Sequence, residues 1–393
     1  MNPEHQRIWE QGDSVIQRFQ RMATKYDGAA DRRYEYESRE GNPVKFTNDK
    51  LTRNEEVLDR LQSNLLPMLQ FQTINLFESL NPLGLQQEPE SKIQLISQNQ
   101  LNVETHVDEL RNWFDEVCSG HLARAYPSND YHYQRSKFFR LSSLKGYILE
   151  ASQDIGRSCR IAYDILNRAK RSTQPPSQQT NKMYHQGILL AEKANRSFQA
   201  AIECIKGSEL DVAEKRWQSS LVSIDDSLRN IIGLVTPLTN SSPRQNLIQE
   251  SVTDLAKSAI ILIKVHKVFF AKFFSKSGAI RINIPCYTEM SSDQIASIVR
   301  SVEGVAKELL GLVGHLKGTG RFGDYITNKL RATPSTLQAR FNPPMDLLLL
   351  YLIPLIPDTA TQDDYREWLL TWSTQRHLSS ENYLKHLADL ASS

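Results

Sequence analysis

The chain has 393 residues, of which 40% are hydrophobic and 23% are charged, and its formal net charge is +2 at pH 7. These values are ordinary for a globular protein that can bury a sizeable core, and the length suits two or three average domains. The small net charge excludes a general preference for nucleic acid or acidic membranes.

The first 171 residues read as an N-terminal helical region. Apolar residues recur at helical spacing from the start of the chain, in a stretch that includes Trp9 and Phe19. The polar segment 27–47 follows and has too few aliphatic residues to form a core. Helical patterning resumes near Asn48, where Pro67 predicts a kink or two shorter helices. Further helices are expected over 102–121 and 135–171.

The polar segment 172–181, STQPPSQQTN, contains adjacent prolines that cannot continue a helix. We interpret it as a linker or as a long loop between helices, with a C-terminal helical bundle over 182–393. A division near Ser241, or packing of all helices as one unit, stays open. Helices are predicted over 182–206 and 209–235, and the Gly207-Ser208 step between them suggests an antiparallel hairpin.

The segment 258–274, SAIILIKVHKVFFAKFF, is apolar enough to suggest a membrane span. Its charged residues, which include Lys264, Lys267 and Lys272, argue against a membrane span. At 100° per residue Lys257, Lys264 and Lys267 gather opposite a broad apolar side, which predicts a core helix at the centre of a large helical domain. That side carries Leu262, Ile263, Val265, Phe269, Phe270, Phe273 and Phe274.

The remaining elements follow the central helix. An irregular loop around Pro285 precedes a helix that Ser291 or Ser292 should cap. Pro343-Pro344 is expected to open a short apolar helix that ends at Pro354 or Pro357. The last helix, 362–391, places Tyr365, Trp368, Leu369 and Trp372 on one stripe, which is first a packing pattern and second a possible interface. The fold class is therefore all-α: an irregular bundle of about ten helices with no sheet of consequence.

Motifs for catalysis, metal binding and cofactor binding are missing from the sequence. Gly318, Gly320 and Gly323 match GxGxxG by letters, but they follow a helix and lack a preceding strand. His266 has no evident nucleophile nearby, and a satisfied structural histidine is the favoured interpretation. His121, His185, His315 and His377 are equally isolated from carboxylates at ligand spacing. We therefore expect no catalytic residue, metal ligand or cofactor.

One basic segment, 131–172, holds nine Lys or Arg against three acidic residues, with aromatic residues between them. Such a pattern could meet a polyanion. A solvated helical face neutralised by neighbouring acids is the favoured alternative, so contact with nucleic acid or anionic lipid is not expected.

The cysteines show no CxxC or Cys/His ligand spacing, and we expect reduced thiols. The N-terminus lacks the basic and apolar regions of a secretory signal, so either the chain is cytosolic or a signal has been removed. The cysteines are Cys118, Cys159, Cys204 and Cys286.

Two segments carry a resemblance to a known family. The first runs from Lys264 to Leu316 and includes VFFAKFFSKSGAI and IPCYTEMSSDQIASIVRSVEGVAKEL; the second is LLLLYLIPLIPDTATQDDYREWLLTWSTQ. Both resemble uncharacterised large helical proteins of Puccinia rust fungi, in a phenylalanine-rich helix, a Pro-x-x-Thr-x-Met loop and a closing tryptophan helix. The resemblance implies a plant pathogen as source and a virulence or avirulence effector that plant immune receptors detect.

The functional hypothesis is non-enzymatic protein recognition, with a host protein or immune receptor as partner. The candidate partner-binding residues are Arg281 and Tyr287, in the loop after the central helix, and Trp368 and Trp372 in the last helix. An intracellular fungal scaffold is the alternative, and an enzyme of unknown class is less favoured. An effector would be secreted into the host cell, whereas a scaffold would stay in the fungal cytoplasm.

Overall fold

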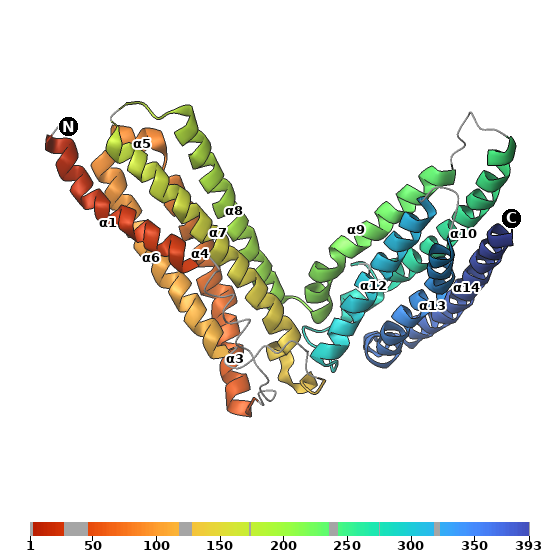
Figure 1. Ribbon diagram of the computed structural model, residues 1–393. Helices are drawn as coiled ribbons and strands as arrows, with labels where there is room; N and C mark the ends of the chain where they lie inside the picture. Colours follow the sequence, from red (N-terminus) through yellow and green to blue (C-terminus); the bar gives the residue numbers. More distant parts are fainter. Residues whose placement is uncertain are drawn as a thin grey trace. The chain divides into compact units, whose positions relative to one another are not determined.

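The structure is a computed structural model that describes residues 3–26, 46–117, 128–172, 174–235, 243–274, 276–317 and 323–392 (Figure 1). Its described residues form helices and contain no strand, which confirms the all-α prediction. The chain divides into two compact units, Met1–Gly207 and Ser208–Ser393. Among the described helices, none combines the length and the apolar character that crossing a membrane requires.

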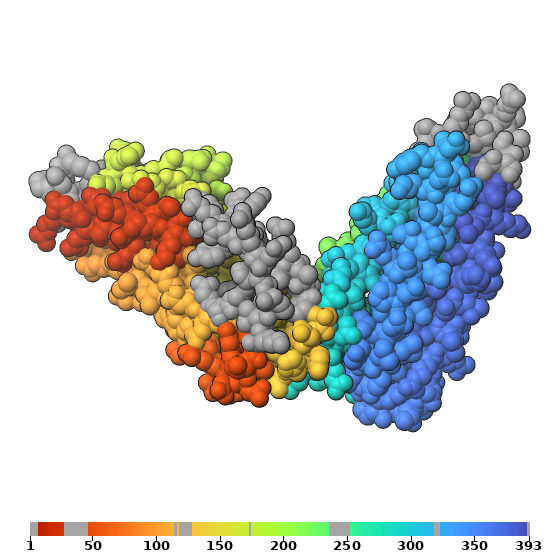
Figure 2. All heavy atoms as spheres, turned by 60° about the horizontal axis from the view of Figure 1, so that its bottom comes forward, coloured from red at the N-terminus to blue at the C-terminus, as the bar shows by residue number. Residues whose placement is uncertain are grey.

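The first unit is a ring of long helices packed in the order α1, α7, α8, α4 and α6, with α6 returning to α1. In Figure 2, α1 (red) lies along α6 (orange). The core of the ring is apolar, with Phe19, Leu69, Phe139 and Phe198 fully buried. Its helices are α1 (Pro3–Tyr26), α3 (Asn48–Arg60), α4 (Leu66–Glu78), α5 (Pro82–Gln87), α6 (Pro89–Val117), α7 (Phe138–Arg171) and α8 (Gln178–Lys206).

The second unit is also a ring, in the order α9, α12, α13, α14 and α10, with α10 returning to α9. The apolar side predicted for the central helix is buried except for the half-buried Val265, and Leu262, Ile263, Phe269 and Phe273 are fully covered. Lys257, Lys264 and Lys267 on the opposite side are exposed. Its helices are α9 (Glu209–Val235), α10 (Pro243–Phe274), α11 (Ala279–Asn283), α12 (Ser292–Lys317), α13 (Asp324–Leu347) and α14 (Thr359–Ser392).

Two wide π turns each precede a proline. The turn Leu61–Leu65 lies before Pro67, and the turn Leu348–Leu352 lies before Pro354. A proline ring clashes with the carbonyl four residues earlier and supplies no N–H to it. In both cases that carbonyl belongs to the π turn, whose wider backbone makes room for the proline ring. The irregularity expected at Pro67 is therefore a π turn between α3 and α4.

The prolines at 343 and 344 do not open a helix, contrary to the expectation from sequence. Both lie inside α13, which began at Asp324. Leu337, Phe341 and Pro344 are buried on this helix, which packs along α12. The burial of this apolar face offsets the lost backbone hydrogen bonds, and the chain leaves the helical path only after the π turn and the 3-10 turn Ile353–Leu355.

The structure divides the chain at Gly207 and Ser208 and not within 172–181. Helices α7 and α8 pack along each other on either side of that polar segment, so it is a loop between helices of one unit. The two helices expected to form an antiparallel hairpin, α8 and α9, belong to different units. Helix α8 packs on α7 and α4 in the first unit, whereas α9 packs on α12 and α10 in the second.

Candidate interaction surface

The segment between α10 and α12 presents apolar side chains to solvent. Ile282 on α11 is 70% exposed, and Tyr287 in the following loop is 41% exposed. Pro285 between them is also exposed. We call Ile282, Pro285 and Tyr287 the 282–287 surface. Of its members, the sequence had pointed to Tyr287 alone, since an isoleucine within a short helical turn carries no periodic signal.

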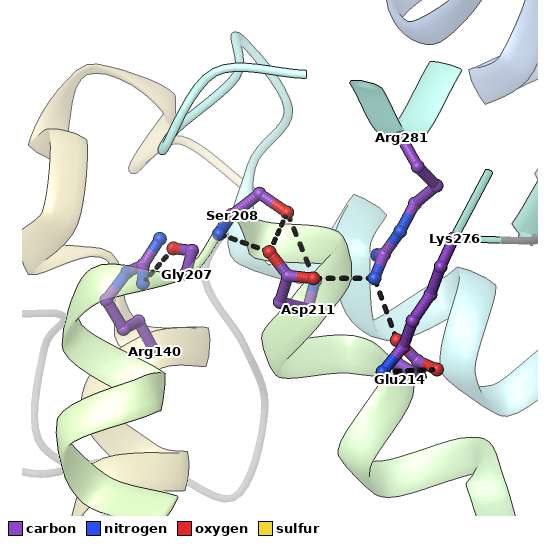
Figure 3. A network of polar contacts seen from close by, with 7 residues as sticks. All are labelled: Arg140, Gly207, Ser208, Asp211, Glu214, Lys276 and Arg281. Carbon is purple, nitrogen blue, oxygen red and sulfur yellow. Dashed lines mark hydrogen bonds and ion pairs between the residues drawn. The ribbon is translucent and has the colours of Figure 1, made fainter. Parts of the chain in front are cut away.

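Arg281 directly precedes Ile282 in the chain but is not part of this surface, and Figure 3 shows its contacts with Asp211 and Glu214. Its Nη2 atom lies 2.6 Å from Oδ1 of Asp211 and 2.7 Å from Oε2 of Glu214, and only 4% of its side chain is exposed. Nζ of Lys276 approaches Glu214 at 3.9 Å. The expectation that Arg281 is an exposed binding residue is therefore corrected, because its guanidinium fastens α11 to α9.

Asp211 also caps the N-terminus of α9 together with Ser208. The backbone N–H and the hydroxyl of Ser208 both donate to Oδ2 of Asp211 at 2.7 Å, and the N–H of Asp211 donates to Oγ of Ser208 at 3.2 Å (Figure 3). This reciprocal capping satisfies N–H groups that have no intrahelical partner. Burial acts to raise the pKa of Asp211, but the bonds from Ser208 and the charges of Arg281 and Lys276 lower it overall. The carboxylate is thus held ionised between two helices.

A buried carboxylate fixes the loop that carries Tyr287. Glu209 is 1% exposed, and its Oε2 accepts hydrogen bonds from the backbone N–H of Thr288 at 3.0 Å and from its hydroxyl at 2.5 Å. The Thr288 hydroxyl oxygen also accepts from the N–H of Met290, whose side chain is fully buried. The threonine of the Pro-x-x-Thr-x-Met loop is therefore a structural residue.

The loop ends in a cap that the sequence predicted. Oγ of Ser291 accepts from the N–H of Gln294 at 3.3 Å, and the Gln294 side chain accepts from the N–H of Ser291 at 2.8 Å. The Gln294 amide also donates to the hydroxyl of Tyr351 at 3.3 Å. This capping box starts α12 and fixes the far end of the loop.

The two tryptophans of α14 pack against aromatic side chains in the core of the second unit. Trp372 is 4% exposed and packs against Phe269 and Phe341, with ring centroids 4.6 and 5.1 Å away. Trp368 is half-buried and meets Phe273 at 5.3 Å. The packing interpretation of this stripe is the one the geometry supports, and Trp372 does not offer a free surface.

His266 is a buried structural histidine. It is 1% exposed, and its Nδ1 lies 2.6 Å from the carbonyl oxygen of Leu262. Burial lowers its pKa to about 4; the bond to Leu262 opposes this shift and the charge of Arg376 adds to it. The ring is therefore neutral near pH 7 and packs 5.0 Å from Phe341. Within the described residues, no group of three or more His, Cys, Asp or Glu could hold a metal ion.

Most of the basic segment 131–172 is engaged within the first unit. Arg135 contacts Glu55 at 2.5 Å and Asp59 at 2.9 Å, and Lys170 contacts Asp13 at 2.6 Å. The Arg140 guanidinium is buried and donates to the carbonyl oxygen of Gly207 at 2.8 Å, closing the end of α8 (Figure 3). These contacts support the interpretation of a neutralised helical face.

Several expectations lie outside the described residues. They are Cys118, His121, most of the polar segment 27–47, the region near Ser241 and the glycines at 318 and 320. Cys159 and Cys204 are buried free thiols, and Cys286 is a half-buried free thiol.

Comparison with known protein families supports the same division of the chain. Residues 208–385 match a domain of unknown function, DUF8721, and residues 54–209 match a second domain of unknown function, DUF8723. The two matches meet at the residues where the compact units meet. No curated protein and no solved structure matches the chain.

Proposed function

We propose that the chain is a non-enzymatic protein-recognition protein whose partner docks on the 282–287 surface. The observation that carries the proposal is a solvent-exposed apolar and aromatic loop held by buried polar contacts. Arg281 fixes its beginning, Glu209 fixes its middle through Thr288, and Ser291 caps its end. A loop ordered in advance loses little conformational entropy on binding, and tyrosine is enriched among interface hot spots.

The partner class follows from the resemblance to rust-fungal helical proteins. We propose a plant host protein, either a virulence target or an immune receptor, so that the chain acts as a secreted effector. A fungal scaffold would use the same kind of surface with a partner from the fungus itself. Parallel capture from host and fungal extracts distinguishes these two proposals, because only one source should contain a partner that depends on Ile282 and Tyr287.

The test uses a double variant, Ile282→Ser with Tyr287→Ser, in the full chain. Its control is Ile261→Ser with Tyr325→Ser, which removes the same side-chain types from positions 53% and 70% exposed in the same unit. Partners are captured from plant extract, identified by mass spectrometry, and their affinities are then measured. If both lost side chains are hot spots, affinity falls by a factor on the order of 100 or more.

Circular dichroism melting is recorded for both double variants. Unchanged melting together with lost binding in the 282–287 variant alone supports the proposal. Equal affinity of the wild type and the 282–287 variant for the captured partner contradicts it.

A further inference from the structure

The first unit contains a cavity of about 450 Å³ at the end where α7 turns into α8. Its size lies in the range of small-molecule sites and is too small for a folded partner. Helices α1, α5, α6 and α7 contribute to its walls together with the α7–α8 turn. Its apolar lining consists of Trp9, Pro82, Leu85, Pro89, Ile165 and Ala169, and Pro175 and Pro176 of the turn complete it.

Two arginines give this cavity a positive lining. Arg168 and Arg171 both line it, and neither has a hydrogen-bond or ion-pair partner among the described residues. The other basic residues of segment 131–172 are all engaged. The described lining contains no aspartate or glutamate. Asp13 pairs with Lys170, and Glu88 and Glu90 line a separate shallow hollow.

The first turn of α8 contributes to the same cavity. Ser177 caps this helix by accepting from the N–H of Thr180 at 3.2 Å, and both residues line the cavity. The start of a helix carries a partial positive charge and N–H groups without intrahelical partners. The cavity thus joins a helix N-terminus and two guanidinium groups, for which the described part of the chain offers no partner, to an apolar floor.

We propose that this cavity binds a small aromatic carboxylate. Arginine guanidinium groups match a carboxylate with paired hydrogen bonds, and the carboxylate supplies the negative charge that the described lining lacks. Trp9 is 2% exposed and closes the floor from behind, whereas Pro89, Pro175 and Pro176 are half-buried or exposed and offer the apolar surfaces on which a ring packs. This site is separate from the 282–287 surface, and its occupation does not depend on the proposed recognition of a protein.

Three probes of nearly equal shape separate the contribution of charge to binding from that of apolar contact. They are naphthoate, the uncharged naphthamide and the cationic naphthylmethylamine, each titrated by calorimetry into the full chain. Naphthoate should bind, naphthamide should bind about tenfold or more weakly, and naphthylmethylamine should not bind measurably. Added salt should weaken naphthoate binding because the arginines are exposed to solvent.

Two variants test the two halves of the site. Arg168→Gln with Arg171→Gln should weaken naphthoate binding about tenfold or more, and Ala169→Phe should block it by filling the cavity. The charge control is Arg196→Gln with Arg331→Gln, which removes two exposed arginines elsewhere. The volume control is Ala332→Phe, at an exposed helical position of α13. Both controls should bind naphthoate as the wild type does.

The measurements also decide against the proposal in defined cases. Absence of naphthoate binding, or equal binding of naphthoate and naphthamide, overturns it. A lowered melting temperature of the double arginine variant with unchanged naphthoate affinity overturns it too, because the arginines would then only compensate the dipole of α7. Unchanged binding by Ala169→Phe would place naphthoate outside the cavity.

Discussion

Trp372 donates its indole N–H to the carbonyl oxygen of Val265 across 2.8 Å, so α14 is bonded to the C-terminal third of α10. Four residues after Val265, the ring of Phe269 lies 4.6 Å from the same indole. The tryptophan thus uses its polar atom and its apolar face on the same helix. This relationship explains why the stripe on α14 is a packing element.

Phe269→Ala should lower the free energy of unfolding by about 3 to 5 kcal/mol, because its ring is fully buried and truncation leaves a cavity. Val268→Ala is the control, since Val268 is 50% exposed on the same helix and its loss should cost far less. Urea denaturation followed by tryptophan fluorescence measures both. A loss under about 1 kcal/mol for Phe269→Ala would contradict the core assignment.

Acidification should destabilise the second unit through His266. Its folded pKa of about 4 lies below the unfolded value, near 6.5, so the unfolded chain binds more protons between these values. Stability is therefore fully present above pH 6.5 and is lost as pH falls toward 4. Between pH 7 and pH 5 this histidine accounts for a loss of about 2 kcal/mol.

Urea denaturation at pH 7 and pH 5 measures this loss of stability in the wild type, in His266→Gln and in the exposed control His377→Gln. His266→Gln should reduce the pH dependence, whereas His377→Gln should preserve it. Identical pH dependence in the wild type and His266→Gln would show that the ring is not held neutral.

Arg281→Gln should destabilise the second unit by about 1 to 3 kcal/mol, because it removes a covered guanidinium from Asp211 and Glu214. The matched control is Arg300→Gln, which breaks an ion pair with Asp293 in which the arginine is 54% exposed. Exposed pairs contribute about 0 to 1 kcal/mol. Chemical denaturation of both variants decides the case, and equal effects would mean that Arg281 does not fasten α11.

Cys286 should react first with a thiol reagent in the native protein. It is half-buried, whereas Cys159 and Cys204 are buried and burial raises the pKa of the Cys159 thiol. The experiment uses a Cys118→Ser background, in which a fast phase should disappear on Cys286→Ser. A fast phase that survives this change would show that a buried thiol is accessible.

Full denaturation of the wild type without reductant should release four reactive thiols, because the sequence contains four cysteines and we expect all to be reduced. Fewer would reveal a disulfide. A bulky maleimide on Cys286, next to Tyr287, should also reduce partner binding, which links this probe to the 282–287 surface.

Helix positions and buried faces were predictable because they depend on residues three and four apart. The sequence predicted α9 over 209–235, the bounds that the structure has, and the apolar side of α10. The cap at Ser291 follows from the same local pattern. Such features need no knowledge of the rest of the fold.

Contacts between distant segments were not predictable in this way. Arg281 and Asp211 are separated by 70 residues, so nothing local shows that the arginine is covered. The cavity at the α7–α8 turn likewise needs α1 and α5, which come from a different part of the chain. The segment STQPPSQQTN was ambiguous because a polar, proline-rich composition suits both a linker and a loop.

On either side of the peptide bond between Gly207 and Ser208, the backbone is hydrogen-bonded to a side chain of its own unit. Arg140 holds the carbonyl of Gly207 within the first unit, and Asp211 holds the N–H of Ser208 within the second. If the chain were divided between these two residues, the C-terminus of α8 would keep its hydrogen bond to Arg140, and the N-terminus of α9 would keep its hydrogen bond to Asp211. The boundary between the two family matches falls at this same point of the chain, so each matched segment contains the hydrogen bonds that close its own terminal helix.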